Sequence, residues 1–101
     1  MAEFGKMRKY ELVFILAPNL KAEEQKKEIA KVEKAIESLK GKLEKKEIWG
    51  KKELAYPIRK FKEGIYVKFD LRLPEKKIRD WRGKIKRENK IIRHLLIKRK
   101  S

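Results

Sequence analysis

The sequence predicts an α+β domain in which a four-stranded antiparallel sheet carries two helices on one face. Short segments rich in β-branched and aromatic residues alternate with segments whose hydrophobic residues recur at steps of three and four. Their order along the chain is strand, helix, strand, strand, helix, strand. The 101 residues, 41% of them hydrophobic, suffice for one core and are too few for two. Two right-handed crossovers in this order produce the ferredoxin-like βαββαβ arrangement.

The first two elements are a strand and a helix. The segment Tyr10 to Leu16, YELVFIL, is almost continuously apolar and ends at a Pro-Asn turn, which indicates a central strand. From Lys21 to Lys40 the apolar residues have a helical spacing, and Gly41 is expected to supply the left-handed residue that ends the helix. Its Glu and Lys residues are spaced to pair across one turn, which indicates a solvated face.

A hairpin follows the first helix. We expect a strand over Leu43 to Lys60, a turn at FKEG (61–64) and a strand over Ile65 to Leu73, in which apolar and polar residues alternate. Pro57 interrupts the earlier of the two strands. Because proline cannot donate to a sheet ladder, it is tolerated chiefly in an edge strand. This agrees with the predicted fold, where the second and fourth strands are the edges.

The second helix and the fourth strand complete the domain. Pro74 is expected to open a helix that buries Trp81, and IIRHLLIK (91–98) reads as the fourth strand. Alternation alone leaves the faces of this strand ambiguous, with Ile92 expected to share a face with His94. We place Arg93 outward, because a buried guanidinium without a partner costs several kcal/mol. A neutral imidazole is more easily buried, so the one histidine is interpreted as a core or edge side chain.

The positive charge is concentrated near the carboxyl end. The chain has a net charge of +16, and the segment from Arg82 to Lys100 contains nine basic residues and one acidic residue. Charges that serve only solubility would alternate in sign, so this clustering predicts a polyanionic partner, with nucleic acid as the first candidate. The sheet face without helices is expected to expose contiguous apolar residues, which indicates a partner protein as well.

Several classes of function are excluded or disfavoured by composition. Without cysteine and with one histidine, the chain has no thiolate nucleophile and no metal site, and we expect no cofactor and no small-molecule substrate. A small phosphatase on this fold is the enzyme alternative, and it lacks the positioned acid, base or nucleophile that catalysis needs. No apolar run is long enough to span a membrane, so a cytoplasmic protein is expected. Abundant Lys and Glu and the absence of Thr predict a protein that works at high temperature.

The aromatic residues leave a further alternative open. A free-standing ferredoxin-like module that reads RNA bases would place aromatic side chains on two adjacent central strands. Tyr66 is expected on the uncovered face, but no second central aromatic residue accompanies it. Trp49 is interpreted as a packing residue, since a tryptophan beside a strand is more often buried than free to stack on a base.

The stretch WGKKELAYPI, Trp49 to Ile58, carries a family resemblance. With RKYELVFIL before it and EGIYVKF and IIRHLLIK after it, the chain resembles the family of the sixth protein of the bacterial small ribosomal subunit from Met7 to about Lys98. The resemblance implies a ferredoxin-like fold, no catalysis, and binding to the central domain of small-subunit ribosomal RNA jointly with the eighteenth small-subunit protein. Residues 1–6 precede the family's usual start and are interpreted as a natural extension or an expression remnant. A single domain is expected over 7–101.

The expected contact residues fall into two sets. The cations expected to bind RNA, from the resemblance and from charge clustering, are Arg8, Lys9, Lys51, Lys52, Arg59, Lys86, Lys90, Arg93, Lys98 and Arg99. The residues of the uncovered face expected to contact the partner protein are Val13, Ile15, Tyr66, Leu95 and Ile97.

Overall fold

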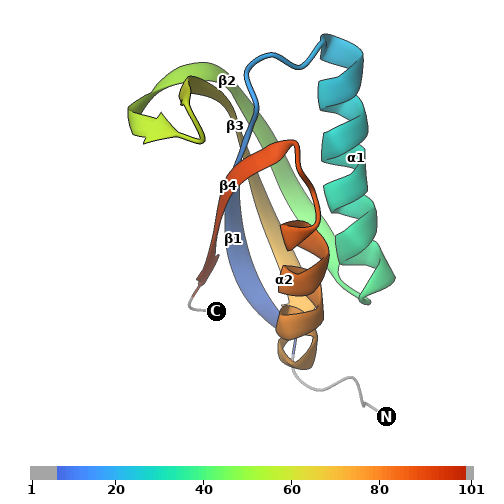
Figure 1. Ribbon diagram of the computed structural model, residues 1–101. Coiled ribbons are helices and arrows are strands. Elements are labelled where there is room, and N and C mark those ends of the chain that lie inside the picture. Colours follow the sequence, from blue (N-terminus) through green and yellow to red (C-terminus); the bar gives the residue numbers. More distant parts are fainter. Residues whose placement is uncertain (1–6, 100–101) are drawn as a thin grey trace.

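The computed structural model describes residues 7–99, and the predicted extension at 1–6, Lys100 and Ser101 lie outside the described residues. The elements are β1 (Met7–Leu16), α1 (Ala22–Ser38), β2 (Lys42–Ile58), β3 (Phe61–Pro74), a short 3-10 turn (Glu75–Lys77), α2 (Ile78–Lys86) and β4 (Ile91–Lys98). The predicted α+β order is confirmed. Both helices lie on the same side of the sheet (Figure 1).

The sheet has the strand order β2-β3-β1-β4, with all neighbours antiparallel. β2 and β4 are therefore the edges, as predicted. The pairing brings Phe14 of β1 opposite Val67 of β3 and opposite His94 of β4, so these three side chains point toward the helices. Every second residue along β1 and β3 consequently faces the helical layer, and the residues between them face away from it.

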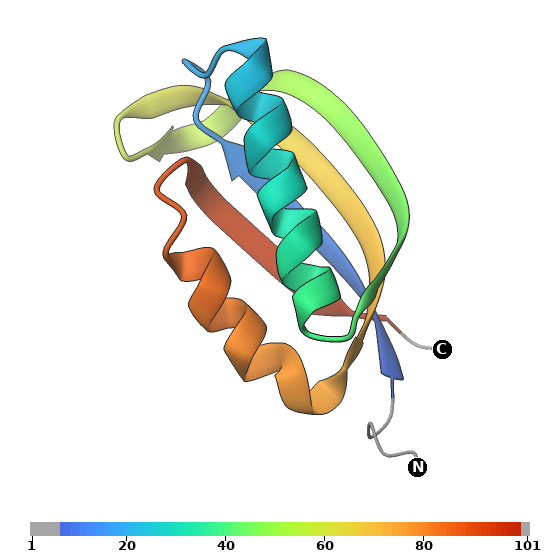
Figure 2. The same cartoon turned by 90° about the vertical axis from the view of Figure 1, so that its right-hand side faces the viewer.

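The core lies between this sheet face and the two helices, which run side by side across it (Figure 2). Phe14 and Phe69 are completely buried and meet edge to face, with ring centroids 5.2 Å apart. α1 contributes Val32 and Ile36 to the same cluster, and α2 contributes Trp81. Burial of side chains of this size stabilises the fold by roughly 1.5–3 kcal/mol each.

The two ends of α1 are determined by different residues. At the start, the carboxylate of Glu24 accepts a hydrogen bond of 3.0 Å from the backbone N–H of Lys21, which satisfies a donor at the helix N-terminus. At the end, the left-handed residue is Lys40, with φ +68°, and not Gly41 as expected from the sequence. Gly41 is needed for space instead, because a Cβ atom there would lie 2.8 Å from the backbone oxygen of Arg72.

The turn between β2 and β3 consists of two residues, Arg59 and Lys60, and the predicted turn at 61–64 is wrong. Ile58 pairs with Phe61, and both turn residues have positive φ angles, +49° and +71°. This is the backbone of a two-residue hairpin turn, which Asn and Gly usually supply. Gly64, the residue that suggested the turn, lies within β3, where a Cβ atom would collide with the side chain of Ile15.

The hairpin end bends over the sheet face that has no helices (Figure 1). Glu53 of β2 pairs with Glu63 of β3, and Ile58 pairs with Phe61. The four residues 54–57 of β2 therefore lie opposite a single residue of β3. Pro57 lies in this irregular stretch at the sheet edge, so its missing N–H leaves no ladder partner unsatisfied. The bend creates a second, small cluster on the open face, which we call the hairpin cluster; it comprises Ile15, Ala17 and Ile92 with the partly buried Leu20, Leu54, Ile58, Phe61 and Tyr66.

A β-bulge in β4 changes the expected faces of that strand. Arg93 pairs with Ile15 and Ile91 with Leu16, so Ile92 is an additional residue that joins the hairpin cluster. The expectation that Ile92 shares the face of His94 is therefore wrong. The outward position of Arg93 is confirmed, and His94 packs edge-on against Trp81 with ring centroids 5.8 Å apart.

Replacing Arg59 and Lys60 with Asn and Gly should raise the free energy of unfolding by about 1–2 kcal/mol, because residues other than Gly and Asn resist left-handed backbone. Denaturant unfolding of the double variant measures this. The matched control is the same replacement at Lys51 and Lys52, two residues of β2 that are paired with β3. This control variant should be less stable than the wild type, because Asn and Gly are unfavourable within a strand. A less stable Asn-Gly turn would contradict the assignment.

Candidate nucleic-acid interface

The two edge strands of the sheet meet on the open face through Arg93 and Tyr56. The Arg93 Nη1 atom donates a hydrogen bond of 3.1 Å to the Tyr56 hydroxyl, and the guanidinium carbon lies 5.9 Å from the centre of the Tyr56 ring. The bend at Pro57 makes this contact possible, since β2 and β4 are separated by two strands in the sheet. An arginine held through one donor atom and through contact with an aromatic ring is oriented and keeps other N–H groups for a further ligand.

A shallow hollow of about 230 Å³ surrounds this contact. We call it the Arg93 corner; its lining residues are Ile15, Leu54, Ala55, Tyr56, Ile58, Tyr66 and Arg93. Three of the cations expected from the sequence, Lys51, Lys52 and Arg59, are exposed on the same hairpin. The corner therefore combines aromatic walls with positive charge.

Beside the corner, Trp49 and Tyr66 form an aromatic stack. Their ring centroids are 6.4 Å apart and the ring planes are inclined by 19°. The ammonium nitrogen of Lys52 lies 5.5 Å from the centre of the Trp49 ring, and Trp49 remains 43% exposed. Gly50, with φ +85°, provides the bulge that turns this part of β2. Trp49 thus packs against Tyr66, as interpreted from the sequence, and is still partly exposed.

The cations expected to bind RNA divide into ion-paired and unpaired groups. Four are paired, with nitrogen–oxygen distances of 3.6 Å for Arg8–Glu75, 3.0 Å for Lys98–Glu75, 3.9 Å for Lys90–Glu24, and 3.5 Å for Arg99 with both Glu11 and Asp70. The hydrogen bond from Lys98 lowers the pKa of Glu75, so this carboxylate stays charged. These four cations already have anionic neighbours within the protein.

The other six have no carboxylate partner within residues 7–99: Lys9, Lys51, Lys52, Arg59, Lys86 and Arg93. Arg93 lines the corner, and Lys51, Lys52 and Arg59 belong to the hairpin that forms it. Lys86 lies on α2, and Lys9 lies on β1 beside Arg99. The six therefore lie on three parts of the described structure: the hairpin with Arg93, α2, and β1.

An uncovered apolar strip runs along β4 and β1. Leu95 and Ile97 are 57% and 44% exposed, and Leu95 is paired with the half-buried Val13. We call these three residues the apolar strip. Tyr66 is half-buried against Trp49, and Ile15 is only 7% exposed beneath the hairpin. Of the residues expected to contact a partner protein, Ile15 is thus the one whose burial does not support that expectation.

Next to the strip, the same face carries a network of paired charges. The ammonium group of Lys68 lies 3.2 Å from the carboxylate of Glu11, and this hydrogen bond raises the pKa of Lys68. Arg99 bridges Glu11 and Asp70, which are opposite each other in the sheet. Because its charges are compensated internally, this part of the face differs from the unpaired Arg93 corner.

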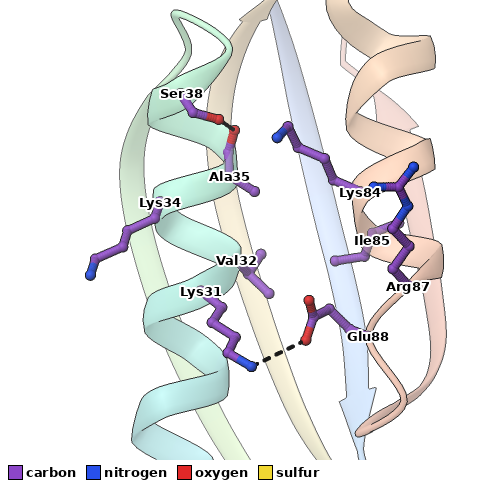
Figure 3. A pocket seen from close by; sticks show the side chains of 9 residues that line it. All are labelled: Lys31, Val32, Lys34, Ala35, Ser38, Lys84, Ile85, Arg87 and Glu88. Atoms are coloured by element: carbon purple, nitrogen blue, oxygen red, sulfur yellow. Dashed lines mark hydrogen bonds and ion pairs between the residues drawn. The ribbon is translucent and has the colours of Figure 1, made fainter.

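The helical side of the molecule has a groove of about 410 Å³ between α1 and α2 (Figure 3). Lys31 reaches across it to Glu88, with a nitrogen–oxygen distance of 3.7 Å. Its other lining residues are apolar, basic or Ser38, so the groove contains no histidine. Within residues 7–99, no group of carboxylates and histidine is arranged to hold a metal ion, and no helix is long and apolar enough to cross a membrane.

Beside this groove, Glu28 is buried, which corrects the expectation that all the charges of α1 are solvated. It is 1% exposed, and its Oε2 atom meets no hydrogen-bond donor. Burial, together with a hydrogen bond to Glu88 and the negative charge there, raises the pKa of Glu28 to about 7. An oxygen without a donor is best satisfied by carrying the proton itself and donating it to Glu88. The pair thus links α1 to the end of α2.

His94 is the one imidazole of the chain, and its surroundings are those of a packing residue. Burial lowers its pKa, and the nearby positive charges of Arg82 and Lys86 lower it further. The ring is therefore neutral at physiological pH and in contact with Trp81. This agrees with the interpretation of His94 as a core or edge side chain.

Residues 9–98 match the family described as Ribosomal protein S6. The chain belongs to this family. It is 32% identical over 90 residues to small ribosomal subunit protein bS6 of Dictyoglomus turgidum, covering 89% of this chain and 93% of that protein. The protein of the same name from Geotalea daltonii is 39% identical over 92 residues, covering 91% of this chain and 72% of that protein.

A solved structure supports the same assignment. The crystal structure of 30S ribosomal protein S6 from Thermotoga maritima superimposes with a TM-score of 0.88 at 36% identity, covering 93% of this chain and 89% of that one. The predicted family and the ferredoxin-like fold are both confirmed. The chain is a ribosomal protein of the small subunit and not an enzyme, because its family consists of structural proteins of the ribosome.

Neither Tyr56 nor Trp49 is among the RNA contacts expected from the sequence. Tyr56 belongs to the predicted strand over 43–60, Trp49 is interpreted as a packing residue, and both are among the exposed large side chains. The available signal was Pro57, which marks an irregular edge strand that can bend. It identifies where the strand departs from the sheet, without showing which residue Tyr56 would reach.

Replacing Glu28 with Gln should remove a pH dependence of stability. A carboxyl group whose pKa rises from 4.5 to about 7 on folding holds its proton longer in the folded state. The free energy of unfolding of the wild type should therefore fall relative to the variant, by about 1–3 kcal/mol, as the pH rises from 4.5 to 8. Denaturant unfolding at several pH values measures the difference.

The control for this experiment is Glu37→Gln, at an exposed position of the same helix. Its stability should follow the wild type at every pH. Parallel profiles for the wild type and Glu28→Gln would show that Glu28 is ionised in the folded protein at neutral pH.

Proposed function

We propose that this protein binds the central domain of small-subunit ribosomal RNA through the Arg93 corner, while its apolar strip holds the eighteenth protein of the small subunit. The complex is expected in the cytoplasm, as part of the ribosome. The observation that carries the proposal is the separation of the cations. Arg93 and the hairpin cations Lys51, Lys52 and Arg59 have no carboxylate partner within residues 7–99. Arg8, Lys90, Lys98 and Arg99 do.

Unpaired cations favour phosphate binding for a physical reason. A lysine or arginine without an internal partner attracts mobile counterions, and a phosphate that replaces them gains the entropy of their release. A cation that already pairs with a carboxylate has fewer counterions to release. Phosphates should therefore bind more strongly at Arg93, Lys52 and Arg59 than at Arg99.

The aromatic side chains beside these cations support RNA as the polyanion. RNA exposes unpaired bases that stack on planar side chains, while duplex backbone offers only phosphates and sugars. Trp49 is partly exposed, and the ammonium group of Lys52 lies over its ring. A nucleotide at this position could place its base on Trp49 and its phosphate near Lys52.

The apolar strip supports a protein partner close to the same RNA. Leu95 and Ile97 are exposed, and Val13 continues the strip onto the next strand. Covering side chains of this size contributes roughly 1.5–3 kcal/mol each. Leu95 lies two residues from Arg93 on β4, so a partner docked on the strip would border the corner and could position RNA there.

A free-standing module that reads RNA bases is the second candidate, favoured by the Trp49–Tyr66 stack. This stack provides the second aromatic residue that the sequence did not place on the open face. It joins the edge strand β2 to β3, however, and the two rings stack on each other, so that Tyr66 is half-buried and Trp49 is the more exposed of the two. RNA affinity that is the same with and without the partner protein would favour this second function.

Replacing Arg93 with Ala should weaken RNA binding in the presence of the partner. A plot of the logarithm of RNA affinity against the logarithm of salt concentration should have a slope near −5 if the protein makes about six phosphate contacts. The loss of one contact should make this slope less steep by about 0.9. A salt titration of RNA affinity measures both effects. Arg99→Ala is the matched control, because Arg99 is paired with Glu11 and Asp70 and should change the slope less. Equal effects of the two variants would contradict the assignment of the corner.

Replacing Leu95 with Glu should abolish partner binding without unfolding the protein, at a cost of about 2 kcal/mol or more in binding free energy. Calorimetric titration with the eighteenth protein measures this. Ile48→Glu is the control, because Ile48 has the same exposed fraction, 57%, and lies on β2 at the opposite edge of the sheet. Partner binding that is insensitive to Leu95→Glu would place the interface elsewhere.

A further inference from the structure

Gly83 lies in the middle of α2 and has no structural reason to be glycine. It is exposed, its φ angle is not positive, and a Cβ atom there would meet nothing within 4 Å. Glycine inside a helix is less stable than alanine because it loses more backbone entropy on folding. The other described glycines have clear roles: Gly41 and Gly64 avoid collisions, and Gly50 has a positive φ angle.

Gly83 lines a hollow of about 720 Å³ on the outer surface of α2. Four exposed cations line it together with Gly83, and we call these five residues the Gly83 face: Lys76, Arg79, Arg82, Gly83 and Lys86. None of the four cations forms an ion pair with another residue of 7–99. The nearby acids are Asp80 and Glu75, and Glu75 already pairs with Arg8 and Lys98.

Among residues 7–99, the one apolar residue that lines this hollow is Ile78, which is half-buried and packs against the core. α2 is flanked by α1 on one side, and no other helix covers its opposite side (Figure 2). The exposed large hydrophobic residues within 7–99 all lie on strands, so none belongs to α2. Protein interfaces usually centre on buried aromatic or aliphatic residues. A bare helix backbone with cations around it is better suited to a polyanion backbone.

We propose that the Gly83 face is a second contact site for the phosphodiester backbone of RNA, separate from the Arg93 corner. This inference rests on the proposed RNA-binding function. Glycine allows a phosphate group to approach the helix backbone closely. Arg79 lies one turn before Gly83 and Lys86 nearly one turn after it, so their side chains can reach a phosphate from both sides. Lys86 was expected from the family resemblance, whereas Gly83, Arg79 and Arg82 were not.

Two substitutions of Gly83 separate RNA binding from folding. Gly83→Ala and Gly83→Gln should both raise the melting temperature, since both residues favour helix. Gly83→Gln should nevertheless weaken binding to a central-domain fragment of small-subunit RNA, measured with the eighteenth protein present, by about tenfold because its side chain occupies the hollow. Gly83→Ala should weaken it less. Ala30→Gln, at an exposed position of α1, is the control and should bind RNA like the wild type.

A third variant tests the charges directly. Replacing Arg79 and Arg82 with Gln should reduce the salt slope of RNA affinity by about 2, one unit for each lost phosphate contact.

The outcomes distinguish this inference from the proposed function. If Gly83→Gln and the double Arg variant bind RNA like the wild type while Arg93→Ala binds weakly, the Gly83 face is not an RNA site and the proposed function stands. If Gly83→Gln keeps its RNA affinity in isolation but loses the partner protein, the face contacts protein, and the inference is wrong. If the wild type with its partner does not bind the RNA fragment, the proposed function and this inference both fail.

Discussion

The two helices cover only one face of the sheet, and this constraint determines how the residues of the other face are stabilised. Phe14, Val67 and Phe69 are buried under α1 and α2, so strand alternation places the intervening residues on a face that no helix covers. That face can be stabilised by internal ion pairs, by the bent hairpin, or by another molecule. All three solutions occur side by side: the network around Glu11, the hairpin cluster around Ile15, and the uncovered apolar strip.

The distribution of charge follows the same division. A net charge of +16 on 101 residues repels itself, and the fold relieves part of this repulsion by pairing cations with the available carboxylates. Within residues 7–99, the cations without a carboxylate partner include those of the hairpin, Arg93 and those on the outer side of α2, together with several lysines on the solvated side of α1. Backbone geometry adds to the pattern, because Arg59 has a left-handed φ angle and Gly83 sits inside a helix. Residues that oppose local preference often mark functional positions.

The sequence predicts the elements, the strand order and the family correctly, because hydrophobic spacing and motif residues are local signals. Its errors concern features that depend on distant contacts. Gly64 looks like a turn residue until the side chain of Ile15 is placed beside it, and the turn at Arg59 contains no typical turn residue. The burial of Glu28 depends on where α2 ends relative to α1. Tyr56 enters the site through a bend that residue types alone do not reveal.

The most direct test of the account is the reactivity of each lysine toward acetylation, measured by mass spectrometry in the free protein and in the complex with RNA and the eighteenth protein. Unpaired cations that bind phosphate become protected, whereas cations on the solvated side of α1 do not. We predict that Lys51, Lys52 and Lys86 lose reactivity in the complex, and that Lys26 and Lys34 keep it. Protection confined to α1, with full reactivity at Lys51 and Lys52, would contradict the account.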